Sequence, residues 1–391
     1  MRMRKATSAL VGLLLAGVAA TPAHAETIRS QQWHLDAMKA DEIWKISTGK
    51  GVTVAVIDSG ITQIPELEGQ FVPGKTFSTQ GVEEPAEQGG HGTGISALIA
   101  GTGKHPSGDG GYGLAPGVKI MPLRVPDDQQ WATPSWAAAI RYAADSDAKV
   151  INISLGRSGK PENDATRAEA VRYALSKGKL IFAAVGNSGD SSNELEYPGA
   201  TPGVVGVAAV DATGEPSSES QHGPQVDLTA PGVDIVLACA GKTGICKTHG
   251  TSDSSALASA SAALLWSAHP DWTNNQVLRV LLNTAGKPVD ESGRNDYVGY
   301  GLVRPRVALQ TPGDPGPADV YPLPDLAAAA AGGGKPSASP DGKAPDSAAS
   351  KPAAKAEEKK SGSSLPWIAL GLGACVLIGG AVTVVFVRRN R

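Results

Sequence analysis

The chain has 391 residues and a formal net charge of −3, with 35 Lys and Arg residues against 38 Asp and Glu residues. This balance excludes the concentrated positive charge that binds nucleic acid, and it argues against steering of substrates by bulk charge. The composition is apolar and glycine-rich to about residue 306, then rich in Pro, Ala, Gly, Ser and Lys, and finally apolar with an arginine-rich end. We take these changes as domain boundaries.

Residues 1–25 have the organisation of an export signal. Basic residues within the first five positions precede an apolar stretch at 9–20, and Ala23-His24-Ala25 provides the small-x-small pattern that signal peptidase cleaves. A retained N-terminal anchor is the alternative, although the apolar stretch is short for a membrane span. We predict a signal peptide over 1–25 and export of a mature chain that starts near Glu26.

Strand and helix patterns alternate through the following part of the chain. Two helices are expected, at 134–144 with Thr133 as N-cap and at 165–176 with Gly178 just beyond the end. Five short apolar runs without strict alternation are typical of central parallel strands: 52–57, 118–125, 150–153, 180–185 and 204–210. The alternation predicts an α/β fold with a doubly wound, mostly parallel sheet and a site at the carboxyl ends of its strands.

Two chemically active residues follow early elements of this pattern. Asp58 ends the first strand, where an aspartate can also simply close a turn. His91 lies in Gly89-Gly90-His91-Gly92-Thr93-Gly94, before a run of small residues, where a histidine can also satisfy free amides at a helix start. Either residue alone is weak evidence for catalysis.

Two further residues extend the set. Ser252 precedes the segment 254–268, which is small nearly all round and therefore suits a buried central helix. A serine there is either an N-cap or a nucleophile favoured by the helix dipole. Asn187 follows the strand at 180–185, where its side-chain N–H can bind an oxyanion. Four such residues at one edge of one sheet favour a catalytic site.

The order and contexts of these four residues resemble the subtilisin-like serine proteases over residues 33–307. The motif segments that carry the resemblance are Val54-Ala55-Val56-Ile57-Asp58-Ser59-Gly60, His91-Gly92-Thr93-Gly94, Gly250-Thr251-Ser252, Leu114-Ala115-Pro116 and Ser154-Leu155-Gly156. The resemblance implies hydrolysis of peptide bonds by an Asp58, His91 and Ser252 triad, with Asn187 as oxyanion donor. We assign no cofactor and no metal-ligating residues from the sequence, which does not address bound calcium.

The resemblance also implies how a polypeptide substrate binds. It would add a strand to one edge segment, and the opposite wall of the first specificity pocket would come from a second segment. The two segments are Ser154, Leu155 and Gly156, and Ala184, Val185 and Gly186. Because these walls are small, we expect a pocket open to mid-sized side chains.

Two features depart from the family pattern. Asp253-Ser254-Ser255-Ala256 follows Ser252 where most members have Met-Ala-x-Pro, so we expect a less rigid helix start with an unchanged triad. The stretch from Glu26 to the first strand is too short for a folding pro-domain, so we predict activity without autoprocessing. His249 is a rival base, but it shares the approach loop of Ser252, and we interpret it as a residue of the cleft rim.

The three cysteines fall into two groups. Cys239 and Cys246 lie in the exported domain, where a disulfide between them would contribute about 2 to 3 kcal/mol. A metal site is the alternative, although no second pair of thiols at ligand spacing accompanies them. Cys375 lies in the apolar run near the C-terminus.

We expect a peptidase domain over 26–310, and the residues that follow are expected to tether this domain to the membrane. Residues 311–364 have the composition of a disordered linker. Residues 365–387 form an uncharged apolar run long enough to span a bilayer, and the basic tail at 388–391 is then cytoplasmic by the positive-inside rule. A cell-wall sorting signal is the alternative, but the Thr-Gly that it requires is missing.

Taken together, the export signal, the short N-terminal stretch, the cysteine pair, the linker and the anchor resemble the mycosins, membrane-anchored proteases of actinobacterial type VII secretion systems. This resemblance implies a single-pass membrane protein with an extracytoplasmic catalytic domain, secreted substrates and type VII membrane components as partners. A membrane-anchored scaffold with dispensable proteolysis is the second hypothesis. A nucleotide-binding domain is poorly supported, since no G-x-G-x-x-G follows the first strand.

Overall fold

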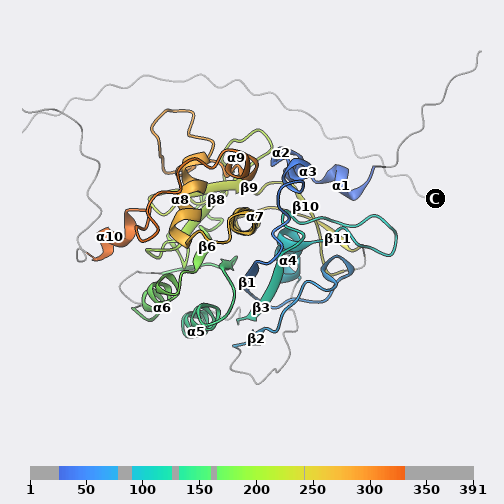
Figure 1. The fold of residues 1–391 in the computed structure, drawn as a ribbon, viewed down its shortest axis with the longest axis horizontal. Helices are drawn as coiled ribbons and strands as arrows, with labels where there is room; N and C mark the ends of the chain where they lie inside the picture. Colours follow the sequence, from blue (N-terminus) through green and yellow to red (C-terminus); the bar gives the residue numbers. More distant parts are fainter. Residues whose placement is uncertain (1–25, 78–89, 126–131, 160–164, 242, 331–391) are drawn as a thin grey trace, which may run out of the picture. The chain divides into compact units, whose positions relative to one another are not determined.

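The computed structural model describes residues 26–77, 90–125, 132–159, 165–241 and 243–330 (Figure 1). The predicted signal peptide at 1–25, the membrane span at 365–387 and the basic tail at 388–391 lie outside the described residues. Within the described ranges, no helix has the length and apolar character that a membrane crossing requires.

A seven-stranded parallel sheet forms the centre of the described part of the chain, in the order β2-β3-β1-β4-β6-β8-β9. The chain begins this sheet in its interior at β1 and extends it in both directions, which confirms the predicted parallel α/β fold. The strands are β1 Thr53–Asp58, β2 Lys75–Thr76, β3 Lys119–Arg124, β4 Val150–Ile153, β6 Leu180–Ala184, β8 Val205–Val210 and β9 Leu228–Pro231.

Five of these strands match the predicted apolar runs, whereas β2 and β9 were not predicted. β2 has only two residues, both at least partly exposed, so it leaves no apolar run in the sequence. β9 is fully buried but spans four residues and ends at a proline, Pro231, which weakens a strand pattern. Both strands lie at the edges of the sheet, where pairing with one neighbour is sufficient.

Helices cover both faces of the sheet (Figure 1). Val54 and Val56 of β1 belong to the core that includes α4 (His91–Ala100) and α7 (Thr251–Ala268). Ala55 and Ile57 belong to the core that includes α5 (Ala132–Ala144) and α6 (Ala165–Ser176). Since both faces are buried, apolar residues occupy both alternating positions along the strand, which explains the unbroken apolar runs.

The helix predicted at 134–144 begins two residues earlier, so the expectation that Thr133 caps it is wrong. α5 starts at Ala132, which places Thr133 and Pro134 within its first turn. A proline is tolerated there because the first N–H groups of a helix have no partner inside it. The other predicted helix matches α6, and Gly178 just beyond it has the positive φ of 73° expected for its position.

Smaller elements complete the described structure around the sheet. Two antiparallel ribbons pair β5 (Arg157–Ser158) with β7 (Glu196–Tyr197) and β10 (Ile235–Ala238) with β11 (Ile245–Thr248). The remaining helices are α1 Ile28–Gln31, α2 Trp33–Ala37, α3 Ala40–Ile43, η1 Pro65–Leu67, α8 Asn274–Thr284, α9 Pro305–Gln310 and α10 Asp325–Ala330.

The first part of the predicted linker packs on the domain, so its expected start at residue 311 does not match the structure. Arg279 of α8 donates hydrogen bonds to the carbonyls of Pro315 and Pro317, at 2.7 and 2.9 Å. Leu323 is buried against the core, and Asp325 accepts a 2.6 Å hydrogen bond from the Gly203 N–H. These contacts depend largely on backbone carbonyls, which carry no composition signal. The rest of the predicted linker, from residue 331, lies outside the described ranges.

Candidate active site

Asp58 stands at the carboxyl end of β1 and is held rigidly there. Its side chain is only 1% exposed, and Oδ1 accepts a 2.8 Å hydrogen bond from the Ser59 N–H. The backbone carbonyl of Asp58 accepts a hydrogen bond from Val125 N–H, which ties the strand end to its neighbour. The carboxylate therefore has a defined direction.

His91 begins helix α4 and faces this carboxylate. Its Nδ1 lies 2.8 Å from Asp58 Oδ1. The close approach needs glycine at the next position, since a Cβ atom on Gly92 would lie 2.1 Å from the Gly60 carbonyl oxygen. With Nδ1 carrying the proton toward Asp58, Nε2 is left to accept a proton from a substrate or nucleophile.

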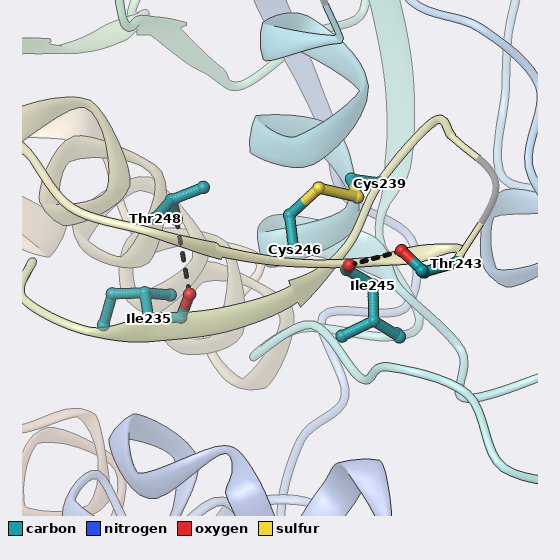
Figure 2. Close-up of a disulfide and its surroundings, with 6 residues drawn as sticks. All are labelled: Ile235, Cys239, Thr243, Ile245, Cys246 and Thr248. Atoms are coloured by element: carbon teal, nitrogen blue, oxygen red, sulfur yellow. Dashed lines mark hydrogen bonds between the residues drawn. A yellow bond between two sulfur atoms is a disulfide. The ribbon is translucent and has the colours of Figure 1, made fainter. Parts of the chain in front are cut away.

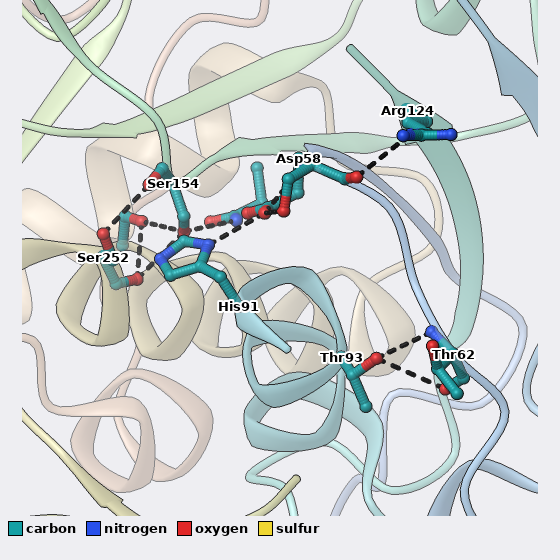
Figure 3. A network of polar contacts seen from close by, with 10 residues as sticks. Asp58, Thr62, His91, Thr93, Arg124, Ser154 and Ser252 are labelled. Carbon is teal, nitrogen blue, oxygen red and sulfur yellow. Dashed lines mark hydrogen bonds and ion pairs between the residues drawn. The ribbon is translucent and has the colours of Figure 1, made fainter. Parts of the chain in front are cut away.

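Ser252 is the second residue of α7 and lies on the other side of the imidazole (Figure 3). The helix starts after Gly250, whose φ of 139° is a conformation that favours glycine. The Ser252 hydroxyl donates a 2.9 Å hydrogen bond to the Ser154 carbonyl. Ser252 lies in the first turn of the helix, so its backbone N–H has no hydrogen-bond partner inside the helix. The helix dipole at this end also favours negative charge.

Asn187 follows β6 and packs against the same helix start. Its Oδ1 accepts hydrogen bonds from the Thr251 N–H at 2.8 Å and from Thr251 Oγ1 at 3.0 Å. Since Oδ1 must face these donors, Nδ2 points elsewhere, and it lies 3.2 Å from the place of a Cβ on Gly250. The side-chain N–H of Asn187 therefore lies beside Gly250 and Thr251, the two residues that precede Ser252.

The structure thus brings together the predicted Asp58, His91, Ser252 and Asn187 at the carboxyl edge of the sheet. Figure 3 shows the imidazole between the Asp58 carboxylate and the Ser252 side chain. The four residues come from β1, α4, α7 and the end of β6, elements far apart in the sequence. The arrangement supplies a base, an orienting carboxylate, a hydroxyl and an N–H donor, the parts needed for nucleophilic attack on a carbonyl.

The segments predicted to bind substrate lie at the ends of two adjacent strands, β4 and β6, and Ala184 is the last residue of β6. Ser154, Leu155 and Gly156 form no strand, and their exposure increases from buried Ser154 to exposed Gly156. Ala184, Val185 and Gly186 are buried, and Gly186 N–H donates to Thr251 Oγ1 at 3.2 Å. The two segments therefore flank the start of α7.

The rival histidine, His249, is paired with a different carboxylate. Its Nδ1 lies 2.8 Å from Glu219 Oε2, and both side chains are well exposed, at 65% and 43%. The structure therefore places His249 in a surface pair, in agreement with a rim position.

Asp253, next to Ser252, is a buried acid without an ion-pair partner among the described residues. It is 4% exposed and accepts a 2.8 Å hydrogen bond from Thr248 Oγ1. Burial raises the pKa of Asp253 to about 6, against the opposing effects of the Thr248 hydrogen bond and of the charges of His91 and His249. The raised pKa brings the ionisation of Asp253 closer to neutral pH, beside the site.

Cys239 and Cys246 are joined by a disulfide across the β10–β11 ribbon (Figure 2). Cys239 N–H also donates to the Gly244 carbonyl, which closes the turn of this ribbon. A metal at this pair would need free thiolates. Among the described residues, no cluster of His, Cys, Asp and Glu has the arrangement of a metal site.

The sequence also matches a known family over most of the domain just described. Comparison with family models aligns residues 49–301 with the subtilase family of peptidases. The chain belongs to the subtilase family.

Individual relatives agree with this assignment. The subtilase is 34% identical over 268 residues to subtilisin BL from Lederbergia lenta, covering 67% of this chain and 92% of that protein. It is 31% identical over 339 residues to mycosin-1 from Mycobacterium tuberculosis, covering 73% and 74%. A chain in the structure of an intact ESX-5 inner membrane complex superposes with a TM-score of 0.67 at 27% identity, covering 83% of this chain and 86% of that chain.

This subtilase is therefore a serine endopeptidase with the subtilisin-like α/β fold, and it is mycosin-like within the family. The predicted family and enzyme class are confirmed.

Two residues that contribute to the site were not predicted. Thr251 orients Asn187 through two hydrogen bonds, and its place inside the Ser252 motif was the available signal. Glu196 of β7 reaches the space between Gly156 and Gly186. No motif surrounds Glu196, and only the tertiary structure brings it to the two segments.

Proposed function

We propose that this subtilase cleaves peptide bonds through an acyl-enzyme formed on Ser252, with His91 as base and Asp58 as its orienting partner. The observation that carries this proposal is the 2.8 Å contact between Asp58 and His91, with Ser252 on the other side of the ring. That contact directs Nδ1–H to the carboxylate and leaves Nε2 to accept the serine proton.

The proposed reaction has two balanced halves. Ser252 Oγ adds to the carbonyl carbon as its proton moves to His91 Nε2; the C–N bond then breaks, and the amine leaves with that proton. A water molecule next gives its proton to His91, adds to the ester and displaces the Ser252 oxygen, which recovers the proton. Asn187 Nδ2 and the Ser252 N–H would donate to the oxyanion in both halves.

Ser252→Ala tests the chemistry directly. We expect hydrolysis of a peptide library by the 26–330 fragment to fall by about a millionfold, to the residual rate that binding alone supports, with unchanged thermal unfolding. Ser267→Ala is the matched control, because this serine lies near the other end of α7 and donates to the Lys50 carbonyl. Undiminished cleavage by Ser252→Ala would contradict the proposed nucleophile.

The proposed place of action is the outer face of a cell membrane, on secreted proteins of a type VII-like system. Support comes from the sequence patterns at 1–25 and 365–387 and from the similarity to mycosin-1 and to a chain of the ESX-5 inner membrane complex. On this proposal the catalytic domain is extracytoplasmic and contacts type VII membrane components, and the C-terminus is cytoplasmic.

The similarity to a chain of a membrane complex also favours the second function, a structural role with dispensable proteolysis. Secretion by cells carrying Ser252→Ala separates the two. Normal secretion in these cells, with loss of secretion in deletion cells, would assign the essential role to scaffolding. Loss in both would assign it to proteolysis.

A further inference from the structure

A carboxylate occupies the space between the two segments proposed to line the first specificity pocket. A Cβ atom on Gly156 would lie 2.4 Å from Glu196 Oε2, and one on Gly186 would lie 2.7 Å from Glu196 Cδ. The acidic side chain fits between these segments because both positions are glycine. Glu196 is partly exposed, so its carboxylate is not sealed within the core.

The direction of this carboxylate is set by its own strand and by one buried amide. Glu196 pairs with Ser158 in the β5–β7 ribbon, two residues beyond Gly156. Gln221, which is fully buried, donates Nε2 to Glu196 Oε1 at 2.9 Å and to Ser188 Oγ at 2.7 Å. One carboxylate oxygen is therefore held, while Oε2 faces Gly156.

The charge of Glu196 has no counterpart in the described part of the chain. Burial raises the pKa of Glu196 and the Gln221 hydrogen bond lowers it, and no cationic side chain adds to these two causes. A half-buried carboxylate without a cation is costly, and a cation that enters the same space removes part of that cost. In other serine proteases a carboxylate in the first pocket selects basic side chains.

We propose that Glu196 selects lysine or arginine at the substrate residue immediately before the cleaved bond. This inference rests on the proposed function, because a backbone aligned along 154–156 sends that side chain between the two segments. A long aliphatic stem would pass the glycines, and its cationic end would bind Oε2. This selectivity takes the place of the earlier expectation of a pocket open to mid-sized side chains.

Matched peptides that differ at this one residue test the proposal. With lysine in place of norleucine, which lacks only the charge, we expect kcat/KM to rise about ten- to a hundred-fold, the value of one charge-assisted hydrogen bond. Glu196→Gln should reduce this ratio to near one. Glu194→Gln, an exposed acid two residues earlier, should keep the full ratio.

Binding to the Ser252→Ala protein gives a readout that needs no turnover. Peptides ending in lysine should bind about ten- to a hundred-fold more tightly than those ending in norleucine, and Ser252→Ala with Glu196→Gln should lose this difference. The proposal would be overturned if each of the two proteins bound the lysine and norleucine peptides equally tightly. The proposal would also be overturned if the protein preferred alanine before the cleaved bond and the Glu196→Ala variant preferred large side chains there. Glu196 would then only fill the pocket.

The two hypotheses fail in different ways. If the unaltered protein, which carries Ser252, cleaves no peptide but the lysine preference in binding persists, the proposed function is contradicted and the selectivity stands. If cleavage depends on Ser252 but is indifferent to lysine, the selectivity is contradicted and the function stands.

Discussion

Two carboxylate–imidazole pairs flank the start of helix α7, and they have the same contact distance. Asp58 and His91 meet at 2.8 Å, as do Glu219 and His249. They differ in burial: the Asp58 carboxylate is 1% exposed and that of Glu219 is 43% exposed. Distance alone therefore does not identify a catalytic pair.

The support behind each pair accounts for the difference. Asp58 ends a central strand and accepts a hydrogen bond from the next backbone N–H, and His91 is anchored by a helix that is otherwise buried. Glu219 and His249 lie in loops, where water screens their attraction and the pair is worth at most about 1 kcal/mol. Rigid backbone support is what a proton transfer at a fixed position requires.

Replacing the histidine of each pair by alanine should give the largest difference in kcat between the two pairs. We expect His91→Ala to lower kcat by about a millionfold, as loss of the triad histidine does in subtilisin, because no other group would accept the Ser252 proton. His249→Ala should change kcat less than about threefold. The measurement is steady-state hydrolysis of one peptide by both variants. A larger loss with His249→Ala would reverse the assignment.

Removing the charge of each carboxylate should give the next largest contrast. Asp58→Asn should lower kcat about ten-thousandfold, since the amide N–H would favour the wrong tautomer of His91. For Glu219→Gln the same assay should show a change below about threefold. Comparable losses in the two variants would show that burial of the carboxylate does not decide its role.

Asn187→Ala asks whether the Asp58–His91 pair works with an oxyanion donor. We expect kcat to fall by about two to three orders of magnitude with little change in KM, because the donor acts on charge that develops only in the transition state. Thr251→Val should produce part of this loss, since it removes one of the two hydrogen bonds that orient Asn187. An effect confined to KM would argue against the donor role.

Asp253 lies close enough to interact with both imidazoles, and its predicted effect is the smallest. Because the pKa of Asp253 is raised to about 6, its ionised form destabilises the folded state above that pH, and the cost disappears below about pH 4, where both states are protonated. Asp253→Asn should raise the free energy of unfolding at pH 8 by about 1 to 3 kcal/mol, with a gain that shrinks from pH 6 to pH 4.

Denaturant unfolding at several pH values measures this effect. Asp147→Asn, at an exposed position, should change stability by less than about 0.5 kcal/mol at every pH and serves as the control. A gain for Asp253→Asn that does not depend on pH would show that its charge is not the cause.

Patterns in the sequence were sufficient to predict features that depend on residues close together along the chain. The strands of the sheet interior were recognisable because both faces are buried. Asp58, His91, Asn187 and Ser252 could be chosen because each lies at or just after the end of a predicted strand, or at the start of a predicted helix. The start of α5 was misplaced by two residues, because the first turn of a helix accepts proline at several positions.

The sequence alone determined the family, the parallel sheet and the residues expected to converge at its edge, since these follow from apolar periodicity and short motifs. Only the tertiary structure decided that the Asp58 carboxylate is buried and the Glu219 carboxylate is exposed, that 311–330 packs on α8, and that Glu196 lies between Gly156 and Gly186. The physical reason is that burial, and contacts between segments far apart along the chain, depend on which other residues fill the same space.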